Sequence, residues 1–374
     1  MRVAVLAPIS WPTPPKGYGP WEQVAGNIAD GLVRRGLDVT LFATGNSRTA
    51  AHLESVSPVG LNEDPALPGH VLGPLHIAAC FERSGEFDLI HNNFDWLPMT
   101  YALGSRTPPL VTTIHGFSSP TILAAYYACA ARSFFCSISD ADRDPGLAYL
   151  ATTYNGIDPE AFTFSDQPGE YLLFLGRLHP EKGTHLAIEL AQRSGKRLLI
   201  AAIPQDREYF ERKVEPHIDG ERIVFLGAVE GERRNRLLRE ALALVHLTTR
   251  PERFGLTLVE AMACGTPVLG ARMGSVPEIV VDGVTGFCVD SMEEAVARVR
   301  DLPRIDRRAC RRRVETAFTV EHMIDRYLGA YAEALRLGAP PEPTPEQLRW
   351  RAHDWWDRPQ AFTEIPPKPD HWIA

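Results

Sequence analysis

The sequence predicts an α/β protein made of two doubly wound domains, each built on an open, mainly parallel sheet. Three observations predict this class. Short apolar segments alternate with segments of helical periodicity along most of the chain. The alternation stops at a turn-rich stretch, residues 155–170, and then restarts. The length of 374 residues is too great for one ordinary core and suits two domains.

The first half reads as repeated strand–helix pairs. Residues 3–7 form a short apolar run, followed by a loop rich in proline and glycine at 8–20 and by helical periodicity over about 21–35. Gly36 closes that helix, and residues 38–43 are suited to a second strand joined by a right-handed crossover. Further strands are expected at 89–91, 110–115 and 134–138.

The second half repeats the pattern. Strands are expected at 171–175, 198–202, 223–226, 243–247 and 267–270, separated by helices at about 183–194, 206–215, 232–241 and 255–264. Ligands of open α/β sheets bind beyond the carboxyl ends of the strands, so two such domains facing each other would offer a central cleft.

We therefore divide the chain into three parts. Residues 1–165 and 166–325 are two Rossmann-like domains, and residues 326–374 are a C-terminal helix and a tail rich in tryptophan and proline. A disordered tail rarely holds many aromatic side chains. We therefore expect this tail to pack back on the body, through Trp350, Trp355, Trp356 and Trp372.

Charge and composition narrow the function classes. The net charge of −8 argues against a general nucleic-acid surface, which normally carries a basic excess. No apolar stretch approaches the roughly 20 residues of a transmembrane helix, and the amino terminus lacks the pattern of a signal peptide. The six cysteines show no zinc-like spacing. We expect a cytoplasmic protein without a membrane span or a structural metal.

The strongest single motif is FLGRLHPEKG at residues 174–183. An apolar strand ends at Gly176, Arg177 and Lys182 flank a turn, and Gly183 opens a helix. A helix N-terminus offers unpaired amides, and two cations of different geometry beside it suit a diphosphate. A solvated charged turn is the alternative for this motif taken alone.

A second motif, PERFGLTLVEAMACG, follows at residues 251–265. Glu252 lies in a loop at the mouth of the expected helix, and Glu260 lies well inside that helix. A carboxylate can accept hydrogen bonds from both hydroxyls of a ribose, which is the role we assign to Glu260. Phe254 and Gly255 start the helix, where amides are free. The alternative for either glutamate alone is an ordinary helix surface.

The sequence resembles family 4 of the retaining glycosyltransferases, which have the GT-B fold of two Rossmann-like domains. The resemblance extends to about residue 335. Its motifs are PKGYGPWE at 15–22, VTTIHGF at 111–117, the segment 176–183 and the E-x7-E spacing from Glu252 to Glu260.

The resemblance implies a donor site for a nucleotide sugar. It places Arg177 and Lys182 on the donor diphosphate and Glu260 on the ribose. Glu252 lies near the transferred sugar, with the amides of Phe254 and Gly255. Further donor contacts are expected at Gly176, Leu256 and Val229, with the base near 227–229.

The first domain contributes less directly. His115 would face the transferred sugar, and it otherwise reads as a satisfied core or loop histidine. Gly17 and Gly19 would let the loop backbone approach the donor phosphates, or would simply form a tight turn. Two departures from the family pattern matter: Pro20 removes an amide after Gly19, and Arg253 replaces a proline, with its side chain expected in solvent.

The mechanism implied by the resemblance is front-face transfer with retention of configuration and without a metal ion or other cofactor. Arg177, Lys182 and helix amides would stabilise the leaving diphosphate. Asp140 and Asp142 form a formal D-x-D motif, but they lie at an expected helix start, where capping is the better interpretation.

Several alternatives stay open. An NAD-dependent dehydrogenase fits the α/β pattern, although no G-x-G-x-x-G follows a strand and Glu22 stands where its third glycine would fall. A non-catalytic protein that binds a nucleotide sugar would keep the donor site only. An epimerase is a further option. If the chain is a glycosyltransferase, we expect the donor to be a UDP- or GDP-sugar and the acceptor to be a small molecule or a glycoconjugate. A homodimer is compatible with the sequence.

Overall fold

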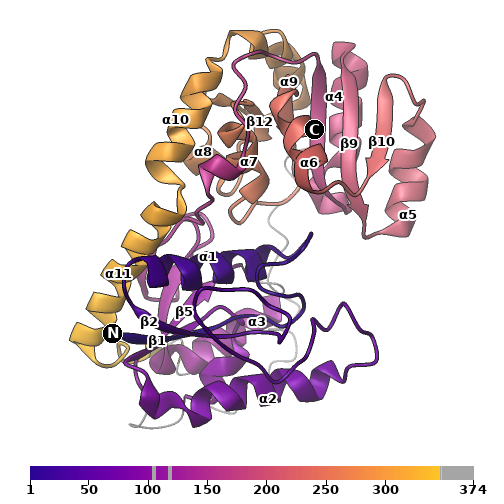
Figure 1. Cartoon of the computed structure of the whole chain (residues 1–374). Helices are drawn as coiled ribbons and strands as arrows, with labels where there is room; N and C mark the ends of the chain where they lie inside the picture. Colours follow the sequence, from indigo (N-terminus) through magenta and orange to yellow (C-terminus); the bar gives the residue numbers. More distant parts are fainter. Residues whose placement is uncertain (103–106, 117–119, 346, 348–374) are drawn as a thin grey trace. The chain divides into compact units, whose positions relative to one another are not determined.

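The computed structural model describes residues 1–102, 107–116, 120–345 and 347 (Figure 1). This part of the chain divides into two compact units. The first comprises Met1–Gly156 together with the described residues from Val320 to Gln347, and the second comprises Ile157–Thr319. Each unit is an α/β structure and is described by itself.

The first unit is built on a seven-stranded parallel sheet with the order β3-β2-β1-β4-β5-β6-β7. Its strands are β1 (Arg2–Leu6), β2 (Asp38–Phe42), β3 (His52–Glu54), β4 (Leu89–Asn92), β5 (Leu110–Ile114), β6 (Phe134–Ser137) and β7 (Tyr149–Thr152). Its longer helices are α1 (Pro20–Arg34), α2 (Gly69–Glu82), α3 (Pro120–Cys129) and α11 (Val320–Leu337). Within this unit, α1 and α11 pack together on one face of the sheet and α2 covers the other (Figure 1).

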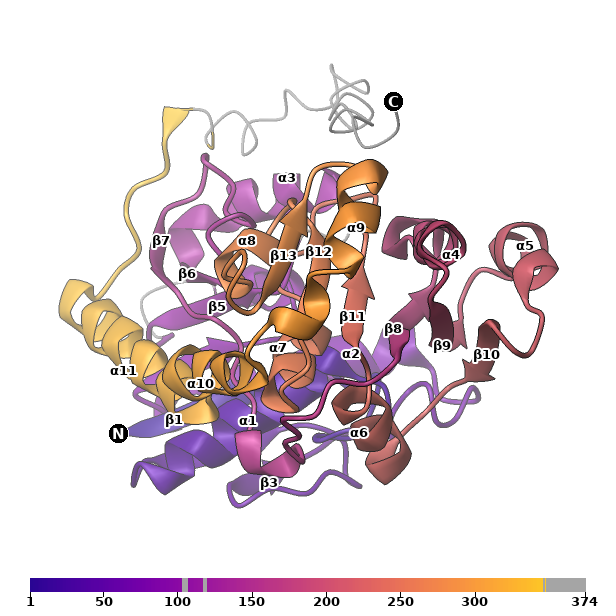
Figure 2. The same cartoon turned by 90° about the horizontal axis from the view of Figure 1, so that it is seen from above.

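The second unit holds a six-stranded parallel sheet with the order β10-β9-β8-β11-β12-β13, seen side by side in Figure 2. Its strands are β8 (Tyr171–Leu178), β9 (Arg197–Pro204), β10 (Ile223–Gly227), β11 (Ala243–His246), β12 (Val268–Ala271) and β13 (Gly286–Val289). Its helices are α4 (Thr184–Ser194), α5 (Arg207–Tyr209), α6 (Gly231–Arg239), α7 (Leu256–Ala263), α8 (Val276–Ile279), α9 (Met292–Val299) and α10 (Arg307–Ala317). Helix α4 packs on α9, and α7 packs on α10.

The alternating pattern of the sequence reproduces the order of most elements, with local differences. Strand β8 continues to Leu178, beyond the expected end at 175, because its pairing with β9 extends to Pro204. The helix expected at 206–215 is one turn, α5, followed by the π-helical segment Phe210–Val214. Strands β3, β7 and β13 were not predicted. They are only three or four residues long, which leaves little periodicity to detect.

The division into units differs from the boundaries expected at 165/166 and 325/326. Residues 157–165 belong to the second unit because Ile157 N donates to Phe318 O (2.9 Å) and Ser165 N donates to Cys264 O (3.1 Å). The chain returns to the first unit at Val320. The four C-terminal tryptophans lie outside the described residues, so the predicted packing of the tail stays a prediction.

A buried polar network attaches α11 to the first sheet. His91 of β4 hydrogen bonds through Nδ1 to the Tyr331 hydroxyl (2.5 Å) and through Nε2 to the Thr113 hydroxyl (2.8 Å). The Thr113 hydroxyl also contacts the Tyr327 hydroxyl (2.9 Å). Burial lowers the pKa of His91 to about 3, so the imidazole is neutral. Helix α11 is therefore an integral part of the first unit.

Among the described helices, none combines the length and the apolar character needed to cross a membrane. The expected helix start at Asp140 is also wrong: Asp140 and Asp142 lie in a turn after β6. There, Asp140 accepts a hydrogen bond from the Thr152 hydroxyl of β7, and the Asp142 amide donates to Ser139 Oγ (3.1 Å). The D-x-D motif therefore stabilises a turn.

Candidate donor site

The carboxyl edge of the second sheet brings the two main motifs together. After β8 the chain makes a 3-10 turn at Pro180–Lys182, and Gly183 begins α4 with φ of 69°. A Cβ on Gly183 would lie 1.8 Å from Leu247 O, so only glycine fits against the segment that follows β11. This close approach brings Lys182 to the segment that carries Glu252.

Lys182, Glu252 and His246 form a compact charged cluster. Lys182 Nζ lies 2.6 Å from Glu252 Oε2, and His246 Nε2 lies 2.8 Å from the same oxygen. The Glu252 and His246 side chains are 10% and 8% exposed, whereas Lys182 is 24% exposed. Only the cation therefore reaches appreciably into solvent, where it is accessible to an anionic ligand.

The Glu252 carboxyl is ionised in this cluster. Burial alone would raise its pKa, but the hydrogen bond from His246 and the charge of Lys182 together hold that pKa well below its ordinary range. A carboxylate with two oxygens keeps further lone pairs when one oxygen is engaged. Glu252 can therefore still accept hydrogen bonds from ligand hydroxyls.

The loop before α7 has little freedom. Gly274 lies so close that a Cβ there would be 2.3 Å from Glu252 O, and Ser275 N donates to that carbonyl (3.0 Å). The Ser275 hydroxyl donates to Phe254 O (2.8 Å). The Phe254 ring is buried against Phe318, with ring centroids 6.0 Å apart. Phe254 thus anchors the loop, and its buried side chain does not face a ligand.

Glu260 lies inside α7 and pairs with Arg234 of α6. The Glu260 side chain is 13% exposed and Arg234 is 28% exposed. Burial raises the pKa of Glu260, and the nearby Arg234 guanidinium opposes that rise. Gly255, with φ of 86°, caps α7, and Leu256 is its first helical residue. The carboxylate assigned to a ribose thus has a cationic partner that the sequence did not predict.

The remaining donor residues lie along the same edge. Gly176 was expected to end its strand. It lies inside β8 instead, because the pairing of β8 with β9 continues past it. Arg177 donates from Nη1 to Gln205 Oε1 (2.6 Å), just after β9. Val229 is half-buried two residues after β10, which ends in Gly227 with φ of 69°. Their contacts with a donor stay predictions.

His115 belongs to the first unit and directly follows β5. It is 9% exposed, its Nε2 donates to Asn93 Oδ1 (3.0 Å), and its ring stacks on Trp21 with centroids 5.6 Å apart. Burial lowers the pKa of His115 to about 4, so the imidazole is neutral at physiological pH. A neutral, fixed imidazole can contact a hydroxyl without adding charge.

The loop before α1, which carries Gly17 and Gly19, is compact around Gly19. A Cβ on Gly19 would lie 2.8 Å from Pro15 Cβ, while Gly17 is exposed in a bend. Pro20 is the first residue of α1, a position whose amide has no intrahelical partner, so the proline is compatible with the helix. The buried Glu22 carboxylate accepts from Trp11 N (3.1 Å) and holds the loop against α1.

Sequence reasoning missed three polar residues beside the predicted ones: His246, Arg234 and Asn93. His246 and Asn93 lie at the carboxyl ends of β11 and β4, the edge at which ligands of such sheets bind. Their positions at strand ends were a usable signal. Arg234 lies within a helix of mainly arginine, glutamate and leucine, where nothing in the sequence marks it out.

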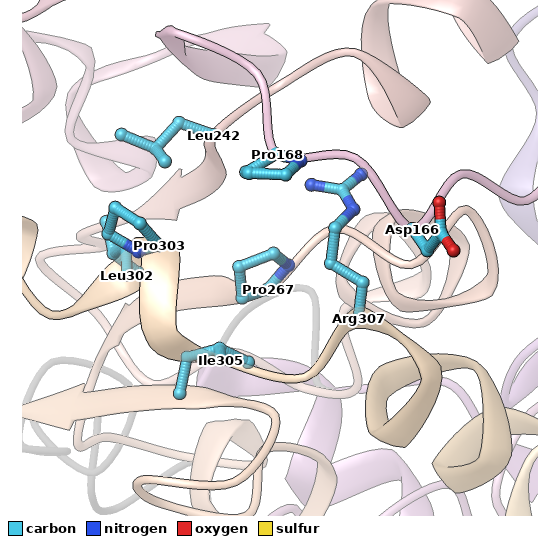
Figure 3. A pocket seen from close by; sticks show the side chains of 8 residues that line it. All are labelled: Asp166, Pro168, Leu242, Pro267, Leu302, Pro303, Ile305 and Arg307. Atoms are coloured by element: carbon cyan, nitrogen blue, oxygen red, sulfur yellow. The ribbon is translucent and has the colours of Figure 1, made fainter.

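A small cavity lies at the opposite, amino edge of the second sheet, and a lining residue, Arg307, stabilises the fold there (Figure 3). Leu242 and Pro267, which precede β11 and β12, contribute to it together with Arg307. The buried Arg307 guanidinium donates to Ser165 O (2.8 Å), Ala241 O (2.9 Å) and Arg239 O (2.6 Å). These hydrogen bonds join α10 to the segment before β8 and to the segment from the end of α6 to β11. The cavity therefore belongs to a structural contact and not to the carboxyl edge of the sheet.

Comparison with known families gives the decisive observation. Residues 160–317 match the family described as glycosyl transferases group 1, and residues 21–160 match the one described as glycosyltransferase family 4. The chain belongs to family 4 of the glycosyltransferases. It is therefore an enzyme with the GT-B fold, and the predicted fold class and family are confirmed. The dehydrogenase and non-catalytic alternatives are not favoured.

This glycosyltransferase has relatives of several activities. It is 29% identical over 303 residues to a glycogen synthase of Mycobacterium tuberculosis, covering 70% of this chain and 72% of the relative. It is 26% identical over 366 residues to a D-inositol 3-phosphate glycosyltransferase of Mycolicibacterium smegmatis, covering 81% and 84%. The solved Anabaena protein HepE in complex with UDP has 21% identity and a TM-score of 0.69, over 89% of this chain and all of the other.

Proposed function

We propose that this glycosyltransferase is a retaining enzyme that takes a UDP- or GDP-linked sugar without a metal ion. The acceptor is proposed to be a small molecule or a glycoconjugate with a free hydroxyl. The observation that carries the proposal is the cluster of Lys182, Glu252 and His246, with the Arg234–Glu260 pair on the adjoining helix. Cations and carboxylates meet here at the edge of an α/β sheet where ligands bind.

The charges support a division of labour along the donor. We assign the diphosphate to Arg177 and Lys182, because Lys182 is the more exposed partner of its ion pair and Arg177 is held only by the neutral Gln205 among the contacts described. Glu260 is assigned to the ribose diol and Glu252 to hydroxyls of the transferred sugar. Leu256 and the amide of Gly255 lie at the start of α7, where the helix dipole favours an anion.

The proposed reaction is a substitution at the anomeric carbon. The bond from this carbon to the diphosphate oxygen breaks, a bond to the acceptor oxygen forms on the same face, and the acceptor proton passes to the departing diphosphate. Lys182 and Arg177 stabilise the charge that develops on the leaving group, a contribution that is usually large. His115 is proposed to contact a hydroxyl of the transferred sugar as a neutral imidazole.

The relatives guide the first choice of nucleotide. HepE, which shares the fold, was solved with UDP. UDP is therefore the first nucleotide to test, although identity at this level supports only the fold. We also propose that the protein is cytoplasmic and that it can form a homodimer.

A thermal-shift panel tests this proposal. UDP, GDP, ADP, dTDP and NAD are each added with EDTA and then with magnesium, since a ligand that binds only the folded state raises the melting temperature. We expect UDP or GDP to stabilise the protein equally in both conditions. Stabilisation only with magnesium would refute the metal-independent site, and stabilisation by none of the diphosphates would refute the donor assignment.

A further inference from the structure

Arg234 forms a largely buried ion pair with Glu260. Arg234 lies in α6, and its guanidinium pairs with Oε2 of Glu260, which lies in α7. Both side chains are largely buried, at 28% and 13% exposure. Most ion pairs on this protein are far more exposed and contribute little to stability. The Arg234–Glu260 pair differs from those exposed pairs because both side chains are largely buried and because Glu260 is the carboxylate proposed to bind the ribose.

We propose that Arg234 is a positioning residue for the donor, which orients the Glu260 carboxylate so that it accepts hydrogen bonds from both ribose hydroxyls. This inference rests on the proposed function, in which Glu260 binds the ribose. It adds a residue that neither the sequence motif nor the family match singles out.

The geometry leaves room for the ribose. Arg234 engages Oε2 of Glu260, whereas an ionised carboxylate offers about four lone-pair positions on its two oxygens. Two hydroxyls can therefore bind while the arginine stays in place. A protonated carboxyl would have one oxygen converted to a donor and would accept more weakly, so its hydrogen bonds with the ribose hydroxyls would weaken.

The surroundings of Glu260 make its ionisation depend on Arg234. Cys264 lies one turn further along α7, and burial raises its pKa to about 12, so it carries no charge. Arg307 and Arg311 of α10 are engaged with backbone carbonyls, Arg311 donating to Ala263 O (3.1 Å). Burial raises the pKa of Glu260, and Arg234 is the group that opposes the rise.

Charged groups from β11 and the loop before α7 are already committed to one another. His246 and Lys182 both bind Glu252, which lies at the mouth of the helix. Glu252 therefore has Lys182 and His246 as partners, and Glu260 has Arg234. Each of the two carboxylates of the E-x7-E motif is thus held by partners of its own.

The test compares the affinity of the intact protein for UDP and for 2′-deoxy-UDP, using GDP and 2′-deoxy-GDP instead if the nucleotide panel selects guanosine. The ratio of the two affinities reports the ribose 2′-hydroxyl contact and is insensitive to overall stability. In the wild type we expect a preference for the ribonucleotide of about tenfold or more, because the hydroxyl binds a charged acceptor. E260Q should reduce this preference to near unity.

R234M should lower the ribonucleotide preference severalfold, and R234K, which keeps the charge, should restore part of it. R239M is the matched control: Arg239 lies in the same helix, is 25% exposed and pairs with Glu232 and Glu240. We expect R239M to keep the wild-type preference. The melting temperature without ligand identifies any variant that fails to fold.

The pH profile gives an independent readout. Ribonucleotide affinity should fall at low pH as Glu260 takes up a proton, and R234M should move this inflection to higher pH because the carboxyl loses its cationic partner. E260Q should lack the inflection, which separates it from titration of the nucleotide phosphate. R234K should lie between R234M and the wild type.

The outcomes separate this inference from the proposed function. If no nucleoside diphosphate binds the wild type, the proposed function is wrong and the inference falls with it. If the wild type prefers the ribonucleotide and E260Q abolishes that preference, but a folded R234M keeps both the preference and the wild-type inflection, the proposed function stands and the role of Arg234 is refuted.

Discussion

The polar centres of the two units differ in charge although both lie at the carboxyl edge of a parallel sheet. In the second unit, the largely buried Glu252 and Glu260 side chains are each paired with a cation, Lys182 and Arg234 respectively. In the first unit, His115 and Asn93 are buried neutral groups joined by a hydrogen bond. The same α/β architecture therefore offers one surface suited to a charged diphosphate and one suited to uncharged hydroxyls.

This difference in charge predicts how each polar centre responds to mutation and to low pH. Charged, partly exposed groups such as Lys182 exchange partners when an anionic ligand arrives, so their loss should reduce binding and turnover together. Neutral buried groups such as His115 are fixed before any ligand binds, so their loss should mainly reduce turnover. The predictions below probe this contrast in order of expected effect.

The largest effect is expected for K182M. In the proposed site, removing the cation leaves the leaving diphosphate without one of its two proposed charged partners, so we expect kcat to fall roughly 100- to 1,000-fold. Steady-state kinetics with the donor that the nucleotide panel identifies checks this. K196M is the control, because Lys196 directly precedes β9 and so lies at the amino edge of the sheet, opposite the edge that carries Lys182. A K182M enzyme within threefold of wild type would contradict the charged role of the second unit.

A smaller effect on turnover is expected for H115A. We expect kcat to fall about 5- to 30-fold, as for the loss of one hydrogen bond worth about 1 to 2 kcal/mol, while the dissociation constant of the nucleoside diphosphate stays within about twofold. Titration calorimetry and kinetics on one preparation separate the two quantities. Equal losses in nucleotide affinity and in kcat would break the contrast between the units.

Acid should affect the first unit before the second. Burial lowers the pKa of both His76 and His115 to about 4, below the ordinary 6.5. Since the unfolded chain binds these protons first, the stabilisation is complete above pH 6.5 and is lost as the pH falls through about 4, at roughly 3 kcal/mol for each histidine. Buried carboxyls with raised pKa, such as Glu22, offset part of this loss.

The second unit should respond at lower pH. The pKa of Glu252 is held down by His246 and Lys182, so its contribution is present above the ordinary 4.5 and is lost only as the pH falls below that value. Hydrogen exchange between pH 7 and pH 4, corrected for the intrinsic rate, should show protection lost first in β1, β4 and β5. Earlier loss in β8 and β11 would contradict the assignment of charges.

The smallest effect is expected for R253A. The Arg253 side chain is exposed, and its contact to Glu252 is made by the backbone amide, which the substitution leaves unchanged (3.2 Å to Oε1). We expect kcat and nucleotide affinity within twofold of wild type, measured in the same assays. A tenfold loss would place this cation in the donor site and overturn the expectation that it points to solvent.

The sequence was sufficient to predict the fold class and the close association of the two motifs, for physical reasons. Buried parallel strands leave clear apolar runs, and Gly183 and Gly255 mark positive φ at the starts of α4 and α7. Short edge strands such as β3 carry almost no periodicity and were missed.

Partners that come from distant segments could not be predicted. Arg234 meets Glu260 only because α6 packs beside α7. The return of α11 to the first unit depends on buried contacts, such as that of Tyr331 with His91, which join residues 240 positions apart. Side chains that act through long-range packing leave no local pattern.

The most direct test of the donor assignment is hydrogen exchange with and without saturating UDP, or GDP if the panel selects it. The assignment predicts new protection in the second unit around residues 176–184 and 252–264, with the Arg234 segment of α6 included. Protection confined to the first unit, or absent from 252–264 at saturation, would contradict it.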